Sequence, residues 1–300
     1  MMNRLIFTIT LLLAPLANAD APRVVTSIAP LQGLVADIMA GVGTPILLLD
    51  EPVSPHDFAM RPSQAKAISD ADVVFYIGQD LEPWLEKALR SRDNKELLVA
   101  LGDIPSLHRL EARELDEFGE HHEEDDHDHD HDHEGAYDPH MWLDPSNALV
   151  WLDIITGVLE IADPENKLTY RENLAEAHSA IVIATENARR ALTPLADVEL
   201  IVGHDSTQYF EEVFGLTVIG AFSASDGQNA GARSLNNLLG KLNPGTCVVE
   251  DVTHISRIAA NLPDNIKHAA IDPMGYDQLG AGYYPRLLSS LAQSLSECSD

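Results

Sequence analysis

The sequence predicts an α/β protein of two lobes, each built on a mostly parallel sheet covered by helices, with one long helix joining the lobes. Short apolar runs alternate with helical patterns in both halves of the 300-residue chain, as in parallel sheets with helices on both faces. A chain of this length fits two domains of ordinary size. Between the halves, an unbroken helical pattern from Asp163 to Leu192 provides the connection.

In the first half, four short, mostly apolar runs alternate with stretches that repeat apolar residues at helical spacing. The expected strands are 24–28, 46–49, 73–77 and 97–101. The expected helices are 30–39, 62–71, 82–89 and 146–162. Ligands of open parallel sheets gather at the carboxyl ends of the strands, so we expect a site at that edge.

The connecting helix begins with Asp163 as an N-cap and Pro164 at the first helical position. The alternation then resumes, with expected strands at 200–202, 217–221, 247–250 and 267–271. The expected helices are 208–214, 234–242, 253–262 and 283–297. The predicted organisation is a signal peptide, a first lobe, the connecting helix and a second lobe, at residues 1–19, 20–162, 163–193 and 194–300.

The first 19 residues have the pattern of a secretory signal peptide. Arg4 precedes an apolar stretch, and Ala17-Asn18-Ala19 forms a small-residue cleavage site. The apolar stretch is too short to span a membrane, and no later segment supplies roughly 20 apolar residues. We expect an exported, periplasmic protein cleaved after Ala19. In that oxidising compartment Cys247 and Cys298 form an even pair suited to a disulfide, with two separate buried thiols as the alternative.

The formal net charge of the chain is −29. Nucleic acids and anionic membranes would be repelled by this charge, so neither is an expected partner. A cationic ligand would be attracted.

Residues 120–144 contain two segments with different properties. The first, 120–134, alternates imidazoles and carboxylates without an apolar residue, which predicts a solvated, metal-attracting loop. Its histidines are His121, His122, His127, His129, His131 and His133. The second contains His140, which follows a proline and precedes Met-Trp-Leu. These neighbours hold a histidine rigidly enough to serve in a defined metal site.

Four side chains follow strand ends or the long loop: His56, His140, His204 and Asp272. Two come from each half, which places them at a cleft between the lobes. Three imidazole nitrogens and one carboxylate oxygen suit tetrahedral Zn²⁺. An isolated loop histidine is also commonly a surface or capping residue, and we assign that role to His108, His178, His254 and His268.

Several ordered motifs carry a family resemblance. They are Ser54-Pro55-His56-Asp57-Phe58, Ala71-Asp72-Val73-Val74 with Leu81-Glu82-Pro83-Trp84-Leu85, Asp138-Pro139-His140-Met141-Trp142-Leu143-Asp144-Pro145, Gly203-His204-Asp205-Ser206 and Ile271-Asp272-Pro273-Met274-Gly275. Across these motifs, from Val24 onward, the sequence resembles the metal-binding proteins of ABC importers. It is most similar to zinc-uptake proteins of the ZnuA type, in bacterial solute-binding protein family 9.

The resemblance implies that His56, His140 and His204 bind zinc as a transported ligand, with Asp272 at the carboxylate position. Relatives that favour manganese or iron have a carboxylate where this chain has His204, and a third nitrogen favours zinc. Some relatives have a glutamate where this chain has Pro55. The fourth ligand is therefore Asp272 or a water molecule.

The resemblance also implies an inner-membrane ABC permease as partner, a monomer, and a Cys247–Cys298 disulfide. The acidic histidine loop is typical of zinc-type members. It either gathers zinc, acts as a sensor or docks a periplasmic metallochaperone, or it is a solvated loop with incidental metal binding. From adjacency alone, Asp57, Asp144 and Asp205 are expected to orient the ligand imidazoles.

Two other functions remain alternatives. One is a periplasmic zinc buffer or chaperone that uses the same site. The other is a zinc hydrolase, which needs an open coordination position and a general base. The chain lacks the His-Glu-x-x-His motif of common metalloproteases. We therefore expect a binding protein rather than an enzyme.

Overall fold

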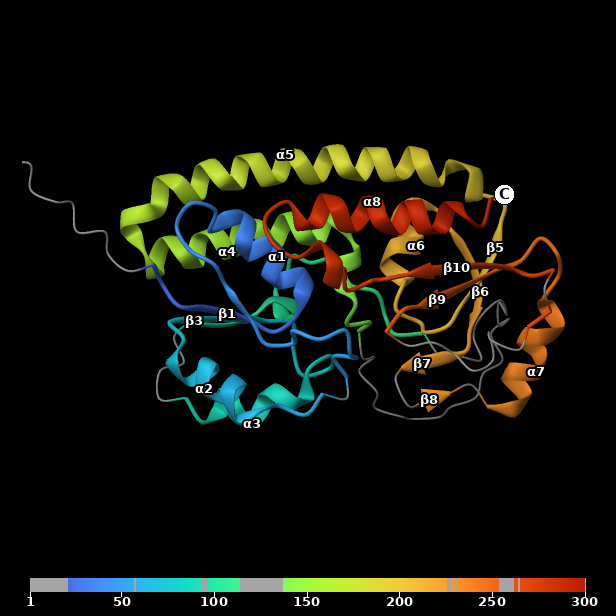
Figure 1. The fold of residues 1–300 in the computed structure, drawn as a ribbon, viewed down its shortest axis with the longest axis horizontal. Helices are drawn as coiled ribbons and strands as arrows, with labels where there is room; N and C mark the ends of the chain where they lie inside the picture. Colours follow the sequence, from blue (N-terminus) through green and yellow to red (C-terminus); the bar gives the residue numbers. More distant parts are fainter. Residues whose placement is uncertain are drawn as a thin grey trace, which may run out of the picture.

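The structure is a computed structural model that describes residues 21–56, 58–92, 97–113, 137–225, 228–229, 231–253, 262–263 and 265–299. Two parallel four-stranded sheets form two lobes, and one long helix runs beside both (Figure 1). The predicted fold class is confirmed. The predicted signal peptide lies outside the described residues.

The first sheet has the strand order β2-β1-β3-β4, and all neighbours are parallel. Its strands are β1 (Val24–Thr26), β2 (Ile46–Leu47), β3 (Val73–Tyr76) and β4 (Leu98–Ala100). One face packs against α1 (Ala29–Ile38) and α4 (Pro145–Ala162), and the other against α2 (Pro62–Asp70) and α3 (Glu86–Arg90). These elements match the predicted alternation within a few residues at their ends.

The second sheet has the order β10-β9-β5-β6. Its strands are β5 (Glu199–Val202), β6 (Thr217–Ala221), β9 (Cys247–Asp251) and β10 (Lys267–Ile271). Taken in chain order within each half, both sheets follow the pattern second-first-third-fourth. The chain therefore changes direction beside the first strand of each sheet, where ligands of such sheets bind.

The helices of the second lobe are α6 (Gln208–Phe214), α7 (Ala232–Lys241) and α8 (Tyr283–Ser296). Most of the helix predicted at 253–262 lies outside the described residues. A short antiparallel pair, β7 (Ser223–Ser225) with β8 (Gln228–Asn229), was not predicted.

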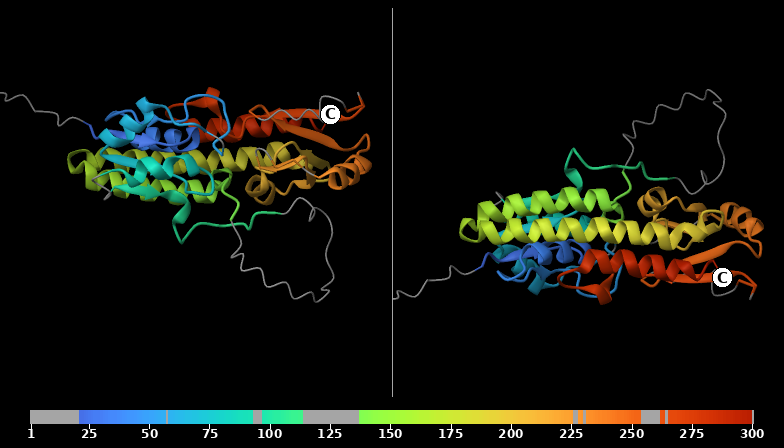
Figure 2. Two further views of the ribbon diagram at one scale, coloured as in Figure 1. Left: turned by 90° about the horizontal axis from the view of Figure 1, so that it is seen from below. Right: turned by 90° about the horizontal axis from the view of Figure 1, so that it is seen from above.

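The long helix α5 (Lys167–Leu192) follows a 3-10 turn at Pro164–Asn166. Its 26 residues span about 39 Å at 1.5 Å per residue. It packs against α4 in the first lobe and α8 in the second, as both views of Figure 2 show. Its buried residues lie on one face: Tyr170, Ala177, Ile181, Ala188 and Leu192.

The last helix, α8, also contacts the first lobe. The packing with α1 is so close that a Cβ placed on Gly33 would lie 2.3 Å from Cγ of Tyr283. Tyr284 donates a hydrogen bond to the carbonyl of Trp142 (2.5 Å), and the indole of Trp142 donates to the carbonyl of Pro273 (2.9 Å). One continuous apolar core therefore joins the two lobes, and this core resists large movements between them.

The predicted disulfide between Cys247 and Cys298 is confirmed, with 5.6 Å between the two Cα atoms. It joins the start of β9 to the end of the chain after α8. Lys267 on the neighbouring strand donates to the Cys298 carbonyl (3.1 Å), so the C-terminal segment is held to the second sheet.

Within the described residues, α4 is the one helix whose length and apolar composition match a membrane span. Its buried residues include Trp151, Leu152, Ile155 and Leu159, all in the apolar core. The apolar character of α4 is therefore explained by its position between α1 and α5.

Candidate metal centre

The structure brings together His56, His140 and His204, although 84 residues separate the first two. His56 follows β2, His140 precedes a 3-10 turn at Met141–Leu143 that leads into α4, and His204 follows β5. One ring nitrogen from each lies within 4.8 Å of the others, and Nε2 of His56 is 3.4 Å from Nε2 of His140. Among the described residues, this is the one such group of three potential metal ligands.

His140 is held by Asp138, two residues before it. A carboxylate oxygen of Asp138 accepts from Nδ1 of His140 (2.7 Å) and from its backbone N–H (2.9 Å). Because Nδ1 carries this hydrogen, the lone pair of Nε2 is left free for a metal. Sequence reasoning missed Asp138, although its place before Pro139 and His140 is the kind of local signal that favours such a contact.

His56 is held by the loop around it. Its backbone N–H donates to the Ser54 hydroxyl (3.1 Å), and the indole of Trp84 donates to the carbonyl of Pro55 (2.8 Å). Burial and, to a smaller extent, the nearby His140 ring lower the pKa of His56 to about 4, against the opposite effect of Asp138. The imidazole is therefore neutral at pH 7, as metal binding requires.

His204 is 6% exposed and lies in the loop between β5 and α6. The backbone of this loop is fixed by two hydrogen bonds. Gly203 N–H donates to the backbone carbonyl of Val249 (2.8 Å), and Asp205 N–H donates to the backbone carbonyl of Ser223 (3.0 Å). The Asp205 carboxylate forms an ion pair with Arg113. Burial raises the pKa of Asp205 to about 6, against the lowering effect of Arg113.

Two of the three carboxylates expected to orient the imidazoles, Asp144 and Asp205, have other partners. Asp144 contacts His108 (2.8 Å) and caps α4 by accepting from Ser146 N–H (2.7 Å). Asp205 pairs with Arg113, and Asp57 lies outside the described residues. In the described part of the chain the carboxylate that orients His140 is Asp138.

Asp272 follows β10 but is not part of the histidine group. Its carboxylate accepts from the backbone N–H groups of Met274, Gly275 and Tyr276 at 2.8–3.0 Å. Gly275 at φ +56° allows this tight turn. Burial raises the pKa of Asp272, and these N–H donors oppose the shift. Its role as the fourth ligand, with water as the alternative, stays a prediction.

The other described histidines, His108, His178 and His268, are not part of this centre. His108 lies between Asp144 and Glu212, at 2.8 and 3.4 Å, and Nε2 of His178 is 3.4 Å from Asp153. His268 is exposed on β10. His254 and the loop histidines His121, His122, His127, His129, His131 and His133 lie outside the described residues.

Comparison with known proteins identifies the family. A family model described as "Zinc-uptake complex component A periplasmic" matches residues 24–298. The chain belongs to the ZnuA family. The "High-affinity zinc uptake system protein ZnuA" of Paracoccus denitrificans (strain Pd 1222) is 34% identical and covers 94% of this chain and 93% of its own length. The protein of the same name from Brucella abortus (strain 2308) is 33% identical, with 92% and 91% covered.

Solved structures share the fold of this ZnuA family member. One described as "Crystal structure of ZnuA" matches with a TM-score of 0.75 at 23% identity, covering 94% of this chain and all of the other. A second, described as a "138-173 ZnuA deletion mutant plus zinc bound", has a TM-score of 0.75 at 24% identity and covers 92% of this chain and 97% of the other. The ZnuA family fold is thus present along nearly the whole chain.

Proposed function

We propose that this ZnuA family member captures Zn²⁺ in the periplasm and delivers it to the inner-membrane permease of an ABC importer. The observation that carries the proposal is the spacing of the histidine nitrogens. Zinc–nitrogen bonds of about 2.05 Å at tetrahedral angles place two ligand nitrogens about 3.3 Å apart. The Nε2 atoms of His56 and His140 are 3.4 Å apart, and all three ring nitrogens lie within 4.8 Å of one another, so the first pair already has the spacing that zinc requires.

The donor set accounts for the proposed preference for zinc. Three neutral imidazoles from His56, His140 and His204 suit a borderline-soft ion, whereas manganese prefers oxygen-rich octahedral sites. Asp272 or a water molecule supplies the fourth position. Copper binds nitrogen ligands more tightly than zinc does, so its exclusion depends on availability rather than on this site.

Capture and release involve no bond-making chemistry beyond coordination, so the protein acts as a carrier and not as an enzyme. The continuous core between the lobes limits the change on loading to small shifts of loops or lobes. The carrier works as a monomer. The acidic histidine loop gathers zinc, acts as a sensor or docks a metallochaperone.

The test of this function is genetic. Deletion of the gene in its own bacterium should cause growth to fail under zinc limitation, and added zinc should restore it. A periplasmic buffer without a permease predicts a different result, namely normal zinc accumulation with increased sensitivity to excess zinc. Accumulation of radioactive ⁶⁵Zn²⁺ by deletion and complemented cells separates these outcomes.

A further inference from the structure

Arg113 connects the two lobes directly beside the histidine centre. It lies on the segment that follows β4 in the first lobe, and its guanidinium contacts two carboxylates of the second lobe. Nη1 donates to Glu211 at 2.8 Å, and Nε donates to Asp205 at 3.2 Å. Asp205 is the residue after the ligand His204, so the guanidinium acts on the loop that carries a metal ligand.

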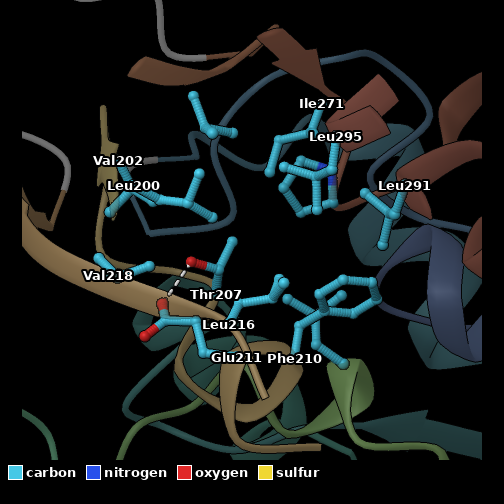
Figure 3. A pocket seen from close by; sticks show the side chains of 13 residues that line it. Leu200, Val202, Thr207, Phe210, Glu211, Leu216, Val218, Ile271, Leu291 and Leu295 are labelled. Atoms are coloured by element: carbon cyan, nitrogen blue, oxygen red, sulfur yellow. Dashed lines mark hydrogen bonds between the residues drawn. The ribbon is translucent and has the colours of Figure 1, made fainter. Parts of the chain in front are cut away.

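These ion pairs are largely shielded from water. The side chains of Arg113, Asp205 and Glu211 are 22%, 5% and 8% exposed. Ion pairs in such positions are screened less than surface pairs, and a two-pronged guanidinium contact fixes direction as well as distance. Glu211 is itself held, because the Thr207 hydroxyl donates to it (2.7 Å) at the edge of a small apolar pocket (Figure 3).

The segment that carries Arg113 also reaches the other buried ligand, His140. The carbonyl of Leu110 accepts from the backbone N–H of Asp138 (2.9 Å), and Asp138 orients His140. The hydroxyl of Tyr209 on α6 donates to the Asp138 carbonyl and accepts from Leu110 N–H, both at 3.0 Å. Residues 110–113 therefore contact the loops of both His140 and His204.

From this arrangement we infer that Arg113 is a positioning residue for the metal centre. Its contacts with Asp205 and Glu211 fix the position of His204 relative to His140, and this fixed spacing sets the affinity for zinc. The inference rests on the proposed zinc-capture function. Arg113 touches no ligand nitrogen in these contacts, so it acts through the His204 loop.

Positioning and simple charge effects predict opposite results for one substitution. Arg113→Met removes a positive charge near a cation site, which by charge alone would tighten zinc binding. If Arg113 positions His204, the same substitution weakens binding by about 10-fold, as is typical for residues that support metal ligands. Arg113→Lys keeps the charge but loses the two-pronged geometry, so it should weaken binding by a smaller factor.

The experiment measures zinc dissociation constants by chelator competition on the full mature chain, together with the visible spectrum of the Co²⁺-loaded protein. The spectrum reports ligand geometry, which a purely structural role would leave unchanged. Arg171→Met is the matched control, because the Arg171 guanidinium also makes a two-pronged contact, with Glu160 (2.6 and 3.2 Å), but at the exposed surface between α4 and α5. It should bind zinc like the parent.

We expect weaker zinc binding and a changed Co²⁺ spectrum for Arg113→Met, a partial effect for Arg113→Lys, and no added effect when Asp205→Asn is combined with Arg113→Met. The inference is overturned if Arg113→Met binds zinc as tightly as the parent or more tightly. It is also overturned if Arg113→Met has a lower melting temperature but unchanged zinc binding and an unchanged Co²⁺ spectrum. If Arg113→Met does not fold, the same measurements on Arg113→Lys and Glu211→Gln test the inference, with weaker zinc binding and a changed Co²⁺ spectrum as the expected result. A parent protein without tight zinc binding would instead overturn the proposed function.

Discussion

Replacing Asp138 tests how the buried imidazole of His140 is prepared for metal. The carboxylate of Asp138 accepts from Nδ1–H of His140 at 2.7 Å, a length typical of a charge-assisted hydrogen bond. Such bonds contribute about 1.5–3 kcal/mol, and loss of a residue that supports a ligand commonly reduces metal affinity 10- to 100-fold. Asp138→Ala should therefore weaken zinc binding by about 30-fold, or about 2 kcal/mol.

Chelator competition at pH 7.5 measures this loss, and thermal melting of the metal-free protein shows whether the fold is kept. Asp138→Asn keeps an acceptor without the charge, so its loss should be smaller. Asp153→Asn is the matched control, because Asp153 lies 3.4 Å from His178 on the surface, away from the centre. Parent-like zinc affinity in Asp138→Ala would refute the assigned role of Asp138.

Three further predictions concern other contacts. Trp84→Phe removes the hydrogen bond from the indole to the Pro55 carbonyl, which helps to hold the His56 loop. Zinc should therefore bind about 2- to 10-fold more weakly in chelator competition. Unchanged zinc affinity would show that this hydrogen bond does not hold His56 in place. The ring of His56 in the metal-free protein should titrate near pH 4 by NMR, since burial lowers its pKa; a midpoint near 6.5 would contradict this. Burial raises the pKa of Glu82 to about 7, above its unfolded value, so the metal-free protein should lose up to about 3 kcal/mol of stability as pH rises from 4.5 through 7. Glu82→Gln should not lose this stability, so urea unfolding at pH 8 should show the variant to be more stable than the parent. A variant that is no more stable than the parent at pH 8 would contradict the prediction.

The fold was predictable because local patterns specify most of it. β-Branched and aromatic runs such as Val24–Thr26 and Val73–Tyr76 lie buried on both faces of the first sheet, so they appear as nearly continuous apolar segments. The exception is Ser223–Ser225, a Ser-Ala-Ser run without β-branched or aromatic residues, which gives no strand pattern.

The histidine centre was predictable in part for a similar reason. Parallel strands place ligand-binding residues at their carboxyl ends, and His56 and His204 follow strands of the first and second sheets, respectively. The contacts that support the ligands were not predictable from adjacency. Arg113 lies 92 residues before Asp205, and Trp84 lies 29 residues after Pro55. Only the folded chain shows that these residues meet.

Deletion of the acidic histidine loop should leave this centre in place. The described residues on either side of the loop, among them Leu110, Arg113, Tyr137 and Asp138, are held by contacts that do not involve residues 120–134. The backbone near the ligands therefore keeps its anchors in the shortened protein. A loop-deleted protein consequently isolates the properties of the three histidines.

The most direct test is a chelator-competition titration of Zn²⁺ and Mn²⁺ on mature protein lacking residues 120–134, beside the same protein carrying His204→Ala. The account predicts one tight zinc site, weak manganese binding, and loss of the tight site in the variant. Manganese that competes well with zinc, or tight zinc binding that disappears with the loop alone, would contradict the assignment of zinc capture to His56, His140 and His204.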